Sequence, residues 1–419
     1  MKKIKARKIK NQSVTVPGSK SYTHRIFIAA ALAKGTSTVI NALNSEDTGL
    51  TLKALVQMGA TVENTNPTII KGFGGKPRPC PDPLYLGNSG TSVRLLTGIA
   101  ALGKGCYRLT GTDRMGQRPI GDLLEGLVQI GVPALCDNAN GCPPLSIDGG
   151  RITGRRLTIK CSESSQYLSS LLLLAPCTTK GLDITIAGEP VSKPYIDMTV
   201  DIMNRFGIVV TRDGYHRFTV EGGQRYRPGT YTVEPDCSQA GYFWGAAAIT
   251  GAAVKVKSIN KKTGQGDLRL VRILEDMGCN VAWAADGVTV TGGELKGIRV
   301  DMADMPDMVP TLAAVAAFAR GKTKITNVAH LRGKESDRLT AVATELTKMG
   351  IETHCGKSGI VITGGIPKGA EIETYNDHRI AMSFAVAGLK APGTVIRNPE
   401  CVEKSFPGFW EVLETLYAE

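Results

Sequence analysis

A pattern that recurs about every 70 residues constrains this chain more than any other feature. Each copy is an Ala- and Leu-rich segment, then a glycine, then a segment typical of a strand, as in AAALAKGTSTVI and GAAAITGAAVKV. Glycine just past a helix suits the left-handed C′ position, and the β-branched residues after it suit a strand. The marker glycines stand 70, 76, 70, 70 and 72 residues apart: Gly35, Gly105, Gly181, Gly251, Gly321 and Gly393.

A second series interleaves with the first. It is an amphipathic segment that ends in glycine before a short strand, as in LKALVQMGATV and LVRILEDMGCNV, and a sixth copy, FWEVLETLYAE, is the last stretch of the sequence. Its glycines stand 72, 76, 71 and 72 residues apart: Gly59, Gly131, Gly207, Gly278 and Gly350. Two interleaved series predict six duplicated units, each with two helices and several strands.

Six such units could close as one ring or as two groups of three. The size of a single hydrophobic core favours an α/β chain with two domains of three units each. The residue pattern of the sequence changes near RYRPGTYTVEPDCSQ, which marks a plausible point where the chain crosses between domains. The basic stretch MKKIKARKIK is expected to be an edge strand that belongs with the second domain. The predicted domains are residues 19–234, and residues 1–18 together with 235–419.

The composition is that of a soluble globular chain, with 42% hydrophobic and 21% charged residues. The formal charge of +12 favours anionic partners, namely nucleic acid, a membrane surface or acidic small molecules. The cysteines form no CxxC pair and the five histidines do not cluster, so we expect no metal site. We see no signal peptide, and the longest uncharged run, 237–254, is too polar to span a membrane, so a cytoplasmic location is expected.

Cations stand where helices are expected to begin. PGSKSYTHR runs into IFIAAALAKG, which predicts a helix start after Gly18 and Ser19. A helix start is already positive, so one cation there costs about 0.3–1 kcal/mol and could pass as a solvated surface residue. Seven cations recur near such starts: Lys20, Arg25, Arg118, Lys334, Arg338, Arg379 and Lys404. If they converge, each pair about 4 Å apart would repel by roughly 4 kcal/mol at an effective dielectric of about 20. A bound polyanion would remove that penalty, so we hypothesise a site for phosphates and carboxylates between the two domains.

Two further helix starts carry neutral groups suited to phosphate. In LGNSGTSVR, Asn88 stands between Gly87 and Gly90, so the backbone can approach a ligand closely, although the stretch also fits a plain glycine turn. No GK[ST] follows, so it is not a Walker loop. CSESSQ offers hydroxyls and an amide, although serine is also a common helix cap: Ser164, Ser165 and Gln166.

The candidates for acid–base chemistry are carboxylates close to these cations: Asp236, Asp307, Glu335, and Asp377 with its neighbour His378. Lys334, Glu335 and Arg338 are expected to share about one helical turn. A carboxylate flanked by cations usually has a lowered pKa and belongs to a structural ion pair. A buried Glu335 could instead donate a proton to an anionic substrate. The spacing leaves both interpretations open.

Ten motifs in order resemble the 5-enolpyruvylshikimate-3-phosphate synthase family: GSKSYTHR, LGNSGTSVR, RMGQRPIGDL, SSQYLSSLLL, SKPYIDMT, PDCSQAGYF, MPDMVPTLA, GKESDRL, YNDHRIAM and EKSFPGF. Each motif is weak alone, but the ordered set is specific and spans nearly the whole chain. The resemblance implies a two-domain inside-out α/β barrel, with three βαβαββ units in each domain. It also implies the family reaction of the shikimate pathway, which glyphosate inhibits. The enolpyruvyl group of phosphoenolpyruvate passes to the 5-hydroxyl of shikimate 3-phosphate, and phosphate is released.

The resemblance also implies residue roles. Shikimate 3-phosphate would be held by Lys20, Ser21, Arg25, Ser164, Ser165, Gln166, Ser192 and Tyr195. Phosphoenolpyruvate would be held by Lys20, Gly90, Arg118, Arg338, Arg379 and Lys404, with Asn88 and His378 completing their motifs. Asp307 would act at the attacking hydroxyl, and Glu335 would protonate the methylene carbon, with Lys334 beside both substrates. Lys20 and Lys334 complete the implied catalytic set. Addition and elimination through a tetrahedral ketal phosphate need no metal or organic cofactor. The expected partners are these two small molecules alone, without nucleic acid or membrane, and the expected state is a monomer.

Some positions depart from the family pattern. Leu95 follows Arg94 where proline is frequent, and His330 stands where asparagine or serine is usual, so that substrate contact is not carried over. The stretch KTGQGD also departs from the family pattern, which leaves Gln265 without an assigned role. The nearest rival is the sister enolpyruvyltransferase that acts on UDP-N-acetylglucosamine. It has Lys-Asn where this chain has Lys20-Ser21, and it uses a loop cysteine that this chain does not match. A nucleic-acid-binding protein is a second alternative. It would interleave basic residues with aromatics on one face, whereas the basic residues of this chain cluster at helix starts with few aromatics.

Overall fold

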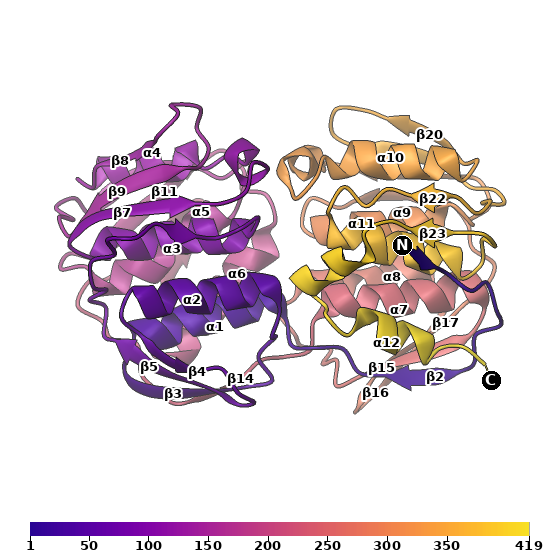
Figure 1. The fold of residues 1–419 in the computed structure, drawn as a ribbon, viewed down its shortest axis with the longest axis horizontal. Helices are drawn as coiled ribbons and strands as arrows, with labels where there is room; N and C mark the ends of the chain where they lie inside the picture. Colours follow the sequence, from indigo (N-terminus) through magenta and orange to yellow (C-terminus); the bar gives the residue numbers. More distant parts are fainter. Residues whose placement is uncertain (419) are drawn as a thin grey trace. The chain divides into compact units, whose positions relative to one another are not determined.

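The computed structural model describes residues 1–418, which form two compact units. The N-terminal unit consists of residues 18–233, and the C-terminal unit of residues 1–17 with the chain from residue 234 onward. The polypeptide therefore passes from one unit to the other twice, after residue 17 and after residue 233. Figure 1 shows the elements of both units, coloured along the sequence.

The N-terminal unit has six helices: α1 (Lys20–Leu32), α2 (Glu46–Gln57), α3 (Gly90–Leu102), α4 (Gly121–Gln129), α5 (Gln166–Leu174) and α6 (Lys193–Arg205). Its strands are β3 (Lys34–Ile40), β4 (Thr61–Glu63), β5 (Thr68–Phe73), β6 (Leu84–Tyr85), β7 (Gly105–Thr110), β8 (Ala134–Cys136), β9 (Leu145–Gly149), β10 (Arg156–Lys160), β11 (Leu182–Ala187), β12 (Thr211–Asp213), β13 (Arg217–Val220) and β14 (Thr230–Thr232). Two 3₁₀ turns complete it: η1 (Met115–Gln117) and η2 (Ala175–Cys177).

The described part of the C-terminal unit also has six helices: α7 (Cys237–Thr250), α8 (Arg269–Asp276), α9 (Val309–Ala316), α10 (Arg338–Lys348), α11 (His378–Gly388) and α12 (Phe409–Glu414). Its strands are β1 (Lys2–Lys3), β2 (Gln12–Val14), β15 (Ala253–Lys257), β16 (Asn280–Ala284), β17 (Gly287–Thr291), β18 (Arg299–Asp301), β19 (Lys322–Thr326), β20 (Glu352–Cys355), β21 (Ile360–Thr363), β22 (Glu371–Ile372) and β23 (Val395–Ile396). Its 3₁₀ turns are η3 (Gly266–Leu268), η4 (Pro306–Met308), η5 (Ala329–Gly333) and η6 (Pro399–Lys404).

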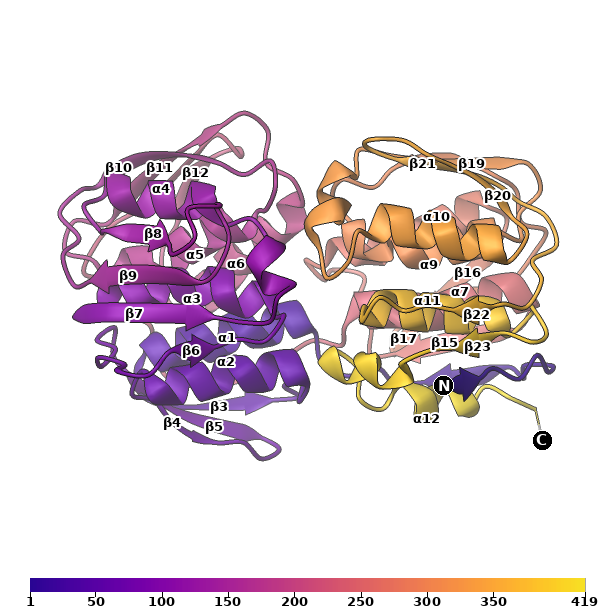
Figure 2. The same cartoon turned by 45° about the horizontal axis from the view of Figure 1, so that its top comes forward.

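The strands form six small sheets, three in each unit, and five of the six have the same topology. In the sheet β6-β7-β9-β8, for example, β6 and β7 are parallel, whereas β9 is antiparallel to both β7 and β8. Along the chain this sheet and its helices read βαβαββ, which Figure 2 shows for β6, β7 and β9 beside α3. The sixth sheet, β1-β23-β22, is a shorter version closed by the N-terminal strand.

Two of the six repeats exchange their first strands. β2 pairs with β15 in the C-terminal unit, although the next helix along the chain, α1, lies in the N-terminal unit. β14 pairs with β3 in the N-terminal unit, and the chain then continues into α7 of the C-terminal unit. The basic stretch of residues 1–10 was predicted as one edge strand. It contains the two-residue strand β1, and β2 begins just after it.

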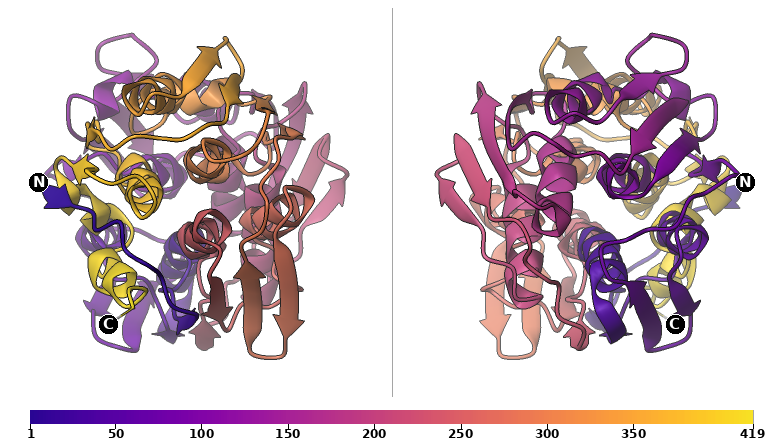
Figure 3. Two further views of the ribbon diagram at one scale, coloured as in Figure 1. Left: turned by 90° about the vertical axis from the view of Figure 1, so that its right-hand side faces the viewer. Right: turned by 90° about the vertical axis from the view of Figure 1, so that its left-hand side faces the viewer.

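The first helix of each repeat lies inside its unit and the sheets lie outside. All residues of α9 and α11 are buried, as are all but one residue of α1 and of α7. In the C-terminal unit, α7, α9 and α11 pack against one another, and Figure 3 (left) shows the helices end-on with strands around them. A helix that is buried on all sides is surrounded by protein, whereas the second-series helices, such as α8, bury one face only. The predicted fold class, an inside-out α/β barrel, is confirmed.

The second-series glycines directly follow the C-cap residues of their helices, at the predicted C′ position, whereas Gly35 lies inside β3 and Gly105 is the first residue of β7. All eleven marker glycines have a positive φ, from 70° at Gly181 to 135° at Gly35. Gly18 serves a different purpose, because a Cβ there would lie 1.9 Å from the carbonyl oxygen of Asn41. This close approach brings the chain onto the first turn of α1.

Candidate active site

The start of α1 carries a buried ion pair. Ser19 is the N-cap, and its hydroxyl accepts from the backbone N–H of Tyr22. Lys20 follows at the first helical position, and its Nζ lies 3.1 Å from Oδ2 of Asp47 in the first turn of α2. Both side chains are buried. Asp47 is not among the site residues that the sequence predicts, so its pairing with Lys20 is a finding of the structure.

Arg25 is a fully buried cation. Within the described residues, its side chain donates hydrogen bonds to neutral oxygens only. Its Nε donates to Thr199 Oγ1 at 2.7 Å, and its terminal nitrogens donate to the carbonyl oxygens of Ser21 and Tyr195 and to Ser169 Oγ. Burial lowers the pKa of Arg25 to about 10. A buried charge without a carboxylate partner is costly, and an anionic ligand would offset that cost.

Arg118 lies directly after η1 and three residues before α4, so it stands just upstream of a helix start. Its Nη1 donates to the backbone oxygen of Asn88 at 2.8 Å and to the side-chain oxygen of Asn88 at 3.2 Å. A Cβ at Gly90, the first residue of α3, would lie 2.3 Å from Nη2 of Arg118. Gly90 therefore allows the guanidinium to lie against the start of α3.

The other predicted residues of the N-terminal unit lie at the starts of α5 and α6. Gln166 accepts from Arg94 Nη1 at 3.1 Å and donates to Thr91 Oγ1 at 2.9 Å, while the hydroxyl of Ser164 accepts from its backbone N–H. Ser165 is the residue before α5, and Ser192 precedes α6 in a left-handed conformation with φ of 56°. The carbonyl oxygens of Ser21 and Tyr195 both accept from Arg25. These hydroxyls and amides form the neutral set that the sequence predicts at helix starts.

In the C-terminal unit, Arg338 lies at the centre of three carboxylates. It is the first residue of α10, and its side chain is 1% exposed. It donates to Asp377 at 2.8 Å, to Asp307 at 2.8 Å and to Glu335 at 2.6 Å. Burial alone would lower the pKa of Arg338, but the three carboxylates outweigh burial and raise it. Ser336, which sequence analysis did not single out, also donates to Asp377.

Arg379, the second residue of α11, shares Asp307 with Arg338. Its Nη2 lies 2.7 Å from Asp307 Oδ2 and 3.2 Å from Ser238 Oγ, and its Nη1 lies 3.4 Å from the hydroxyl of Tyr242. Burial alone would raise the pKa of Asp307, but Arg379, Arg338 and Lys334 together hold it well below its usual range. Asp307 is therefore ionised at neutral pH and accepts hydrogen bonds from both arginines.

One sequence expectation about this cluster is wrong. The helix α10 begins at Arg338, with Asp337 as its N-cap, so Lys334 and Glu335 precede the helix instead of sharing a turn with Arg338. Across both units, carboxylates balance three of the seven cations, namely Lys20, Arg338 and Arg379.

His330 lies beside this cluster, at the position where the family resemblance gave no contact. Its pKa is lowered to about 3, first by burial and then by the charge of Lys334, so the imidazole is neutral at physiological pH. Its Nε2 is buried and makes no hydrogen bond within the described residues. His378, at the start of α11, and Lys404, at the end of η6, are buried in the same unit.

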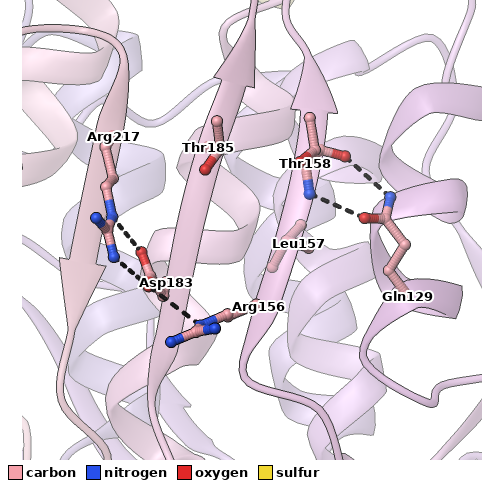
Figure 4. Close-up of a pocket in the computed structure, with 7 residues that line it drawn as sticks. All are labelled: Gln129, Arg156, Leu157, Thr158, Asp183, Thr185 and Arg217. Atoms are coloured by element: carbon pink, nitrogen blue, oxygen red, sulfur yellow. Dashed lines mark hydrogen bonds and ion pairs between the residues drawn. The ribbon is translucent and has the colours of Figure 1, made fainter.

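A separate hollow of about 520 Å³ lies on the outer face of the sheet β10-β11-β13-β12. Figure 4 shows Arg217 and Arg156 around Asp183 on neighbouring strands, and Gln129 bonded to the backbone of Thr158. None of the predicted site residues lines it. Gln129 satisfies the N–H and C=O of the edge strand β10, and Arg217 and Asp183 form a cross-strand pair, so these contacts have a structural explanation.

No helix among residues 1–418 is long and apolar enough to cross a membrane. In the same range, no group of three or more His, Cys, Asp or Glu side chains is arranged to hold a metal ion.

The family model "EPSP synthase (3-phosphoshikimate 1-carboxyvinyltransferase)" matches residues 4–413. A 3-phosphoshikimate 1-carboxyvinyltransferase from Syntrophobacter fumaroxidans is 44% identical over 409 residues, which cover 96% of each chain. One from Methanoculleus marisnigri is 45% identical over 400 residues, covering 95% of this chain and 94% of the relative. The structure of EPSP synthase from Acinetobacter baumannii matches with a TM-score of 0.82 at 32% identity, over 99% of this chain and 97% of the other.

Proposed function

Because the chain belongs to the EPSP synthase family, we propose that it transfers the enolpyruvyl group of phosphoenolpyruvate to the 5-hydroxyl of shikimate 3-phosphate. The products are 5-enolpyruvylshikimate 3-phosphate and phosphate. The observation in the structure that carries this proposal is the buried cluster in which ionised Asp307 accepts from both Arg338 and Arg379. It combines a proton acceptor with fixed cations, which is what a reaction between a hydroxyl and an anionic enol phosphate requires.

Residues of the N-terminal unit would bind shikimate 3-phosphate. Arg25 supplies a buried positive charge. Hydroxyls and an amide of the same unit match phosphate and ring oxygens: Ser21, Ser164, Ser165, Gln166, Ser192 and Tyr195. Lys20 would contact both substrates. The fully buried Arg25 supports this assignment, because its described partners are neutral and a phosphate would supply the opposite charge.

Phosphoenolpyruvate would be held by cations: Lys20, Arg118, Arg338, Arg379 and Lys404, with Gly90 and Asn88 beside Arg118 and His378 beside Arg379. The planar guanidinium groups suit bidentate binding of carboxylate and phosphate. Carboxylates already surround Arg338 and hold its orientation. Such preorganisation stabilises charge that develops in the transition state.

The chemistry would proceed by addition and elimination. Glu335 in its protonated form gives a proton to the methylene carbon, which makes C2 electrophilic, and the 5-hydroxyl forms a new C–O bond to C2 while Asp307 accepts its proton. The C–O bond to phosphate then breaks, and the methyl group returns a proton to Glu335 to restore the double bond. Lys334 and Lys20 would stabilise the negative charge of both substrates during these steps.

The test is phosphate release by the purified protein with phosphoenolpyruvate, measured with and without shikimate 3-phosphate. We expect release only when both are present, in amounts equal to the enolpyruvyl product. UDP-N-acetylglucosamine serves as the rival acceptor and should give no release. Release that requires the UDP-sugar, or that needs no acceptor, would contradict the proposal. We further propose that the protein acts as a monomer in the cytoplasm, which size-exclusion chromatography with light scattering and cell fractionation would test.

A further inference from the structure

The loop between β22 and α11, residues 373–377, has an unfavourable backbone shape. Tyr375 has φ of 54° and Asn376 has φ of 52°, so two successive residues with side chains adopt the left-handed conformation. Such a conformation persists only when surrounding contacts enforce it. The loop leads directly to Asp377, the partner of Arg338, and to Arg379 two residues later.

One buried side chain on α10 contacts this loop at two places. Glu345 is fully buried, and its Oε1 accepts from the hydroxyl of Tyr375 at 2.7 Å. Its Oε2 accepts from the backbone N–H of Glu373 at 3.1 Å. Lys348, one turn further along α10, donates to both oxygens and balances the charge. Burial and the bond to Glu345 both raise the pKa of Tyr375, so its hydroxyl remains protonated and donates.

The same helix holds the far end of the loop. Arg338 donates to both oxygens of Asp377, whose carboxylate also caps α11 by accepting from the N–H of Arg379. Arg338 and Glu345 are seven residues apart, which places them on one face of α10 about 10 Å from each other. α10 therefore holds the loop at two points, and only one of these contains predicted site residues. Figure 2 shows α10 beside β22 and α11.

We infer that Glu345 is a positioning residue. Through Tyr375 and the N–H of Glu373 it holds loop 373–377 in its strained shape, and the loop in turn fixes the direction of the Arg379 guanidinium. This inference rests on the proposed function, in which Arg379 binds phosphoenolpyruvate. A purely structural role, as an (i, i+3) partner of Lys348 within α10, would not explain the two bonds that Glu345 accepts from the loop.

The test is Tyr375→Phe, which deletes one hydroxyl at a part-exposed position and leaves Glu345 paired with Lys348. The loss of one hydrogen bond corresponds to about a three- to tenfold effect. We therefore expect the KM for phosphoenolpyruvate to rise by about that factor, while the KM for shikimate 3-phosphate stays constant. Glu345→Gln keeps an oxygen that can accept from Tyr375, so its KM for phosphoenolpyruvate should lie between those of the wild type and Tyr375→Phe.

Tyr107→Phe is the matched control, because it deletes a hydroxyl that donates to the carbonyl oxygen of Arg78 at 2.8 Å in the N-terminal unit. It should lower the Tm without changing either KM. The inference would be overturned if Tyr375→Phe left both KM values unchanged, whether or not it lowered the Tm. Wild-type protein without enolpyruvyl transfer would refute the proposed function itself, so the two failures are distinguishable.

Discussion

In the mechanism that we propose, Asp307 contacts both phosphoenolpyruvate-binding arginines and also transfers a proton. Its carboxylate accepts from Arg338 and Arg379, the two arginines that we assign to phosphoenolpyruvate, and these cations hold its pKa low. An anionic substrate that engages the same guanidinium groups would share their positive charge. The pKa of Asp307 would then rise, which would make its carboxylate a stronger base when substrate is bound.

At the residue scale, the contact between Gly90 and Arg118 gives a sharp prediction. The methyl group of Gly90→Ala would lie 2.3 Å from Arg118 Nη2, so the guanidinium must move. We expect the KM for phosphoenolpyruvate to rise about tenfold, which corresponds to the loss of one hydrogen bond to a charged group. The KM for shikimate 3-phosphate should stay unchanged in the same steady-state assays.

Gly49→Ala is the matched control for this substitution. Gly49 lies inside α2, and a Cβ there would meet no atom within 4 Å. This variant should be more stable by about 0.5–1 kcal/mol, because alanine favours the helix, and its KM values should equal those of the wild type. Equal KM values in Gly90→Ala and Gly49→Ala would show that Arg118 does not bind phosphoenolpyruvate.

His330 gives a prediction about pH. Its pKa in the folded protein is about 3, below the ordinary value of 6.5, so the unfolded state binds a proton between these values and the folded state does not. Its contribution to stability is therefore complete above pH 6.5 and decreases as the pH falls toward 3. Thermal unfolding of His330→Asn should show a smaller loss of Tm between pH 7 and pH 5 than the wild type. A Tm profile parallel to that of the wild type, or an imidazole that titrates near pH 6.5 by NMR, would contradict this.

At the scale of elements, the repeat predicted most of the architecture. Glycine has a conformational role that few residues share, so the second series of marker glycines located the ends of α2, α4, α6, α8 and α10 from sequence alone. The first series instead marks the starts of β3, β7, β11, β15, β19 and β23. The start of α10 was misplaced because GKESDR contains both charged residues typical of a first turn and the cap Asp337. Lys20 lies 27 residues from Asp47, and Arg338 lies 31 residues from Asp307. A local sequence pattern carries no signal for contacts at that range, so these ion pairs could not be predicted.

The corrected start of α10 can be tested through its cap. Asp337 accepts from the backbone N–H of Thr340 at 3.1 Å, and it also pairs with Arg332. Asp337→Ala should lower the free energy of unfolding by about 1 kcal/mol, measured by urea denaturation. Asp337→Ser should recover most of that loss, because serine also caps helices well. Equal stability of Asp337→Ala and the wild type would mean that the helix does not depend on this cap.

At the scale of the whole molecule, the predicted substrate ligands divide between two units that are joined by two chain connections. The prediction from sequence that substrates bind between the units stays a prediction. If one pair of substrates must contact cations of both units, then binding lowers the repulsion between like charges and favours a more compact molecule. The radius of gyration from small-angle X-ray scattering should therefore decrease when shikimate 3-phosphate is added together with a non-reacting analogue of phosphoenolpyruvate. Arg379→Ala provides the control, because it weakens the second ligand and should reduce the change at the same concentrations. A radius of gyration that is identical with and without both ligands, at concentrations that saturate the wild type in a calorimetric titration, would show that the units do not close on their substrates.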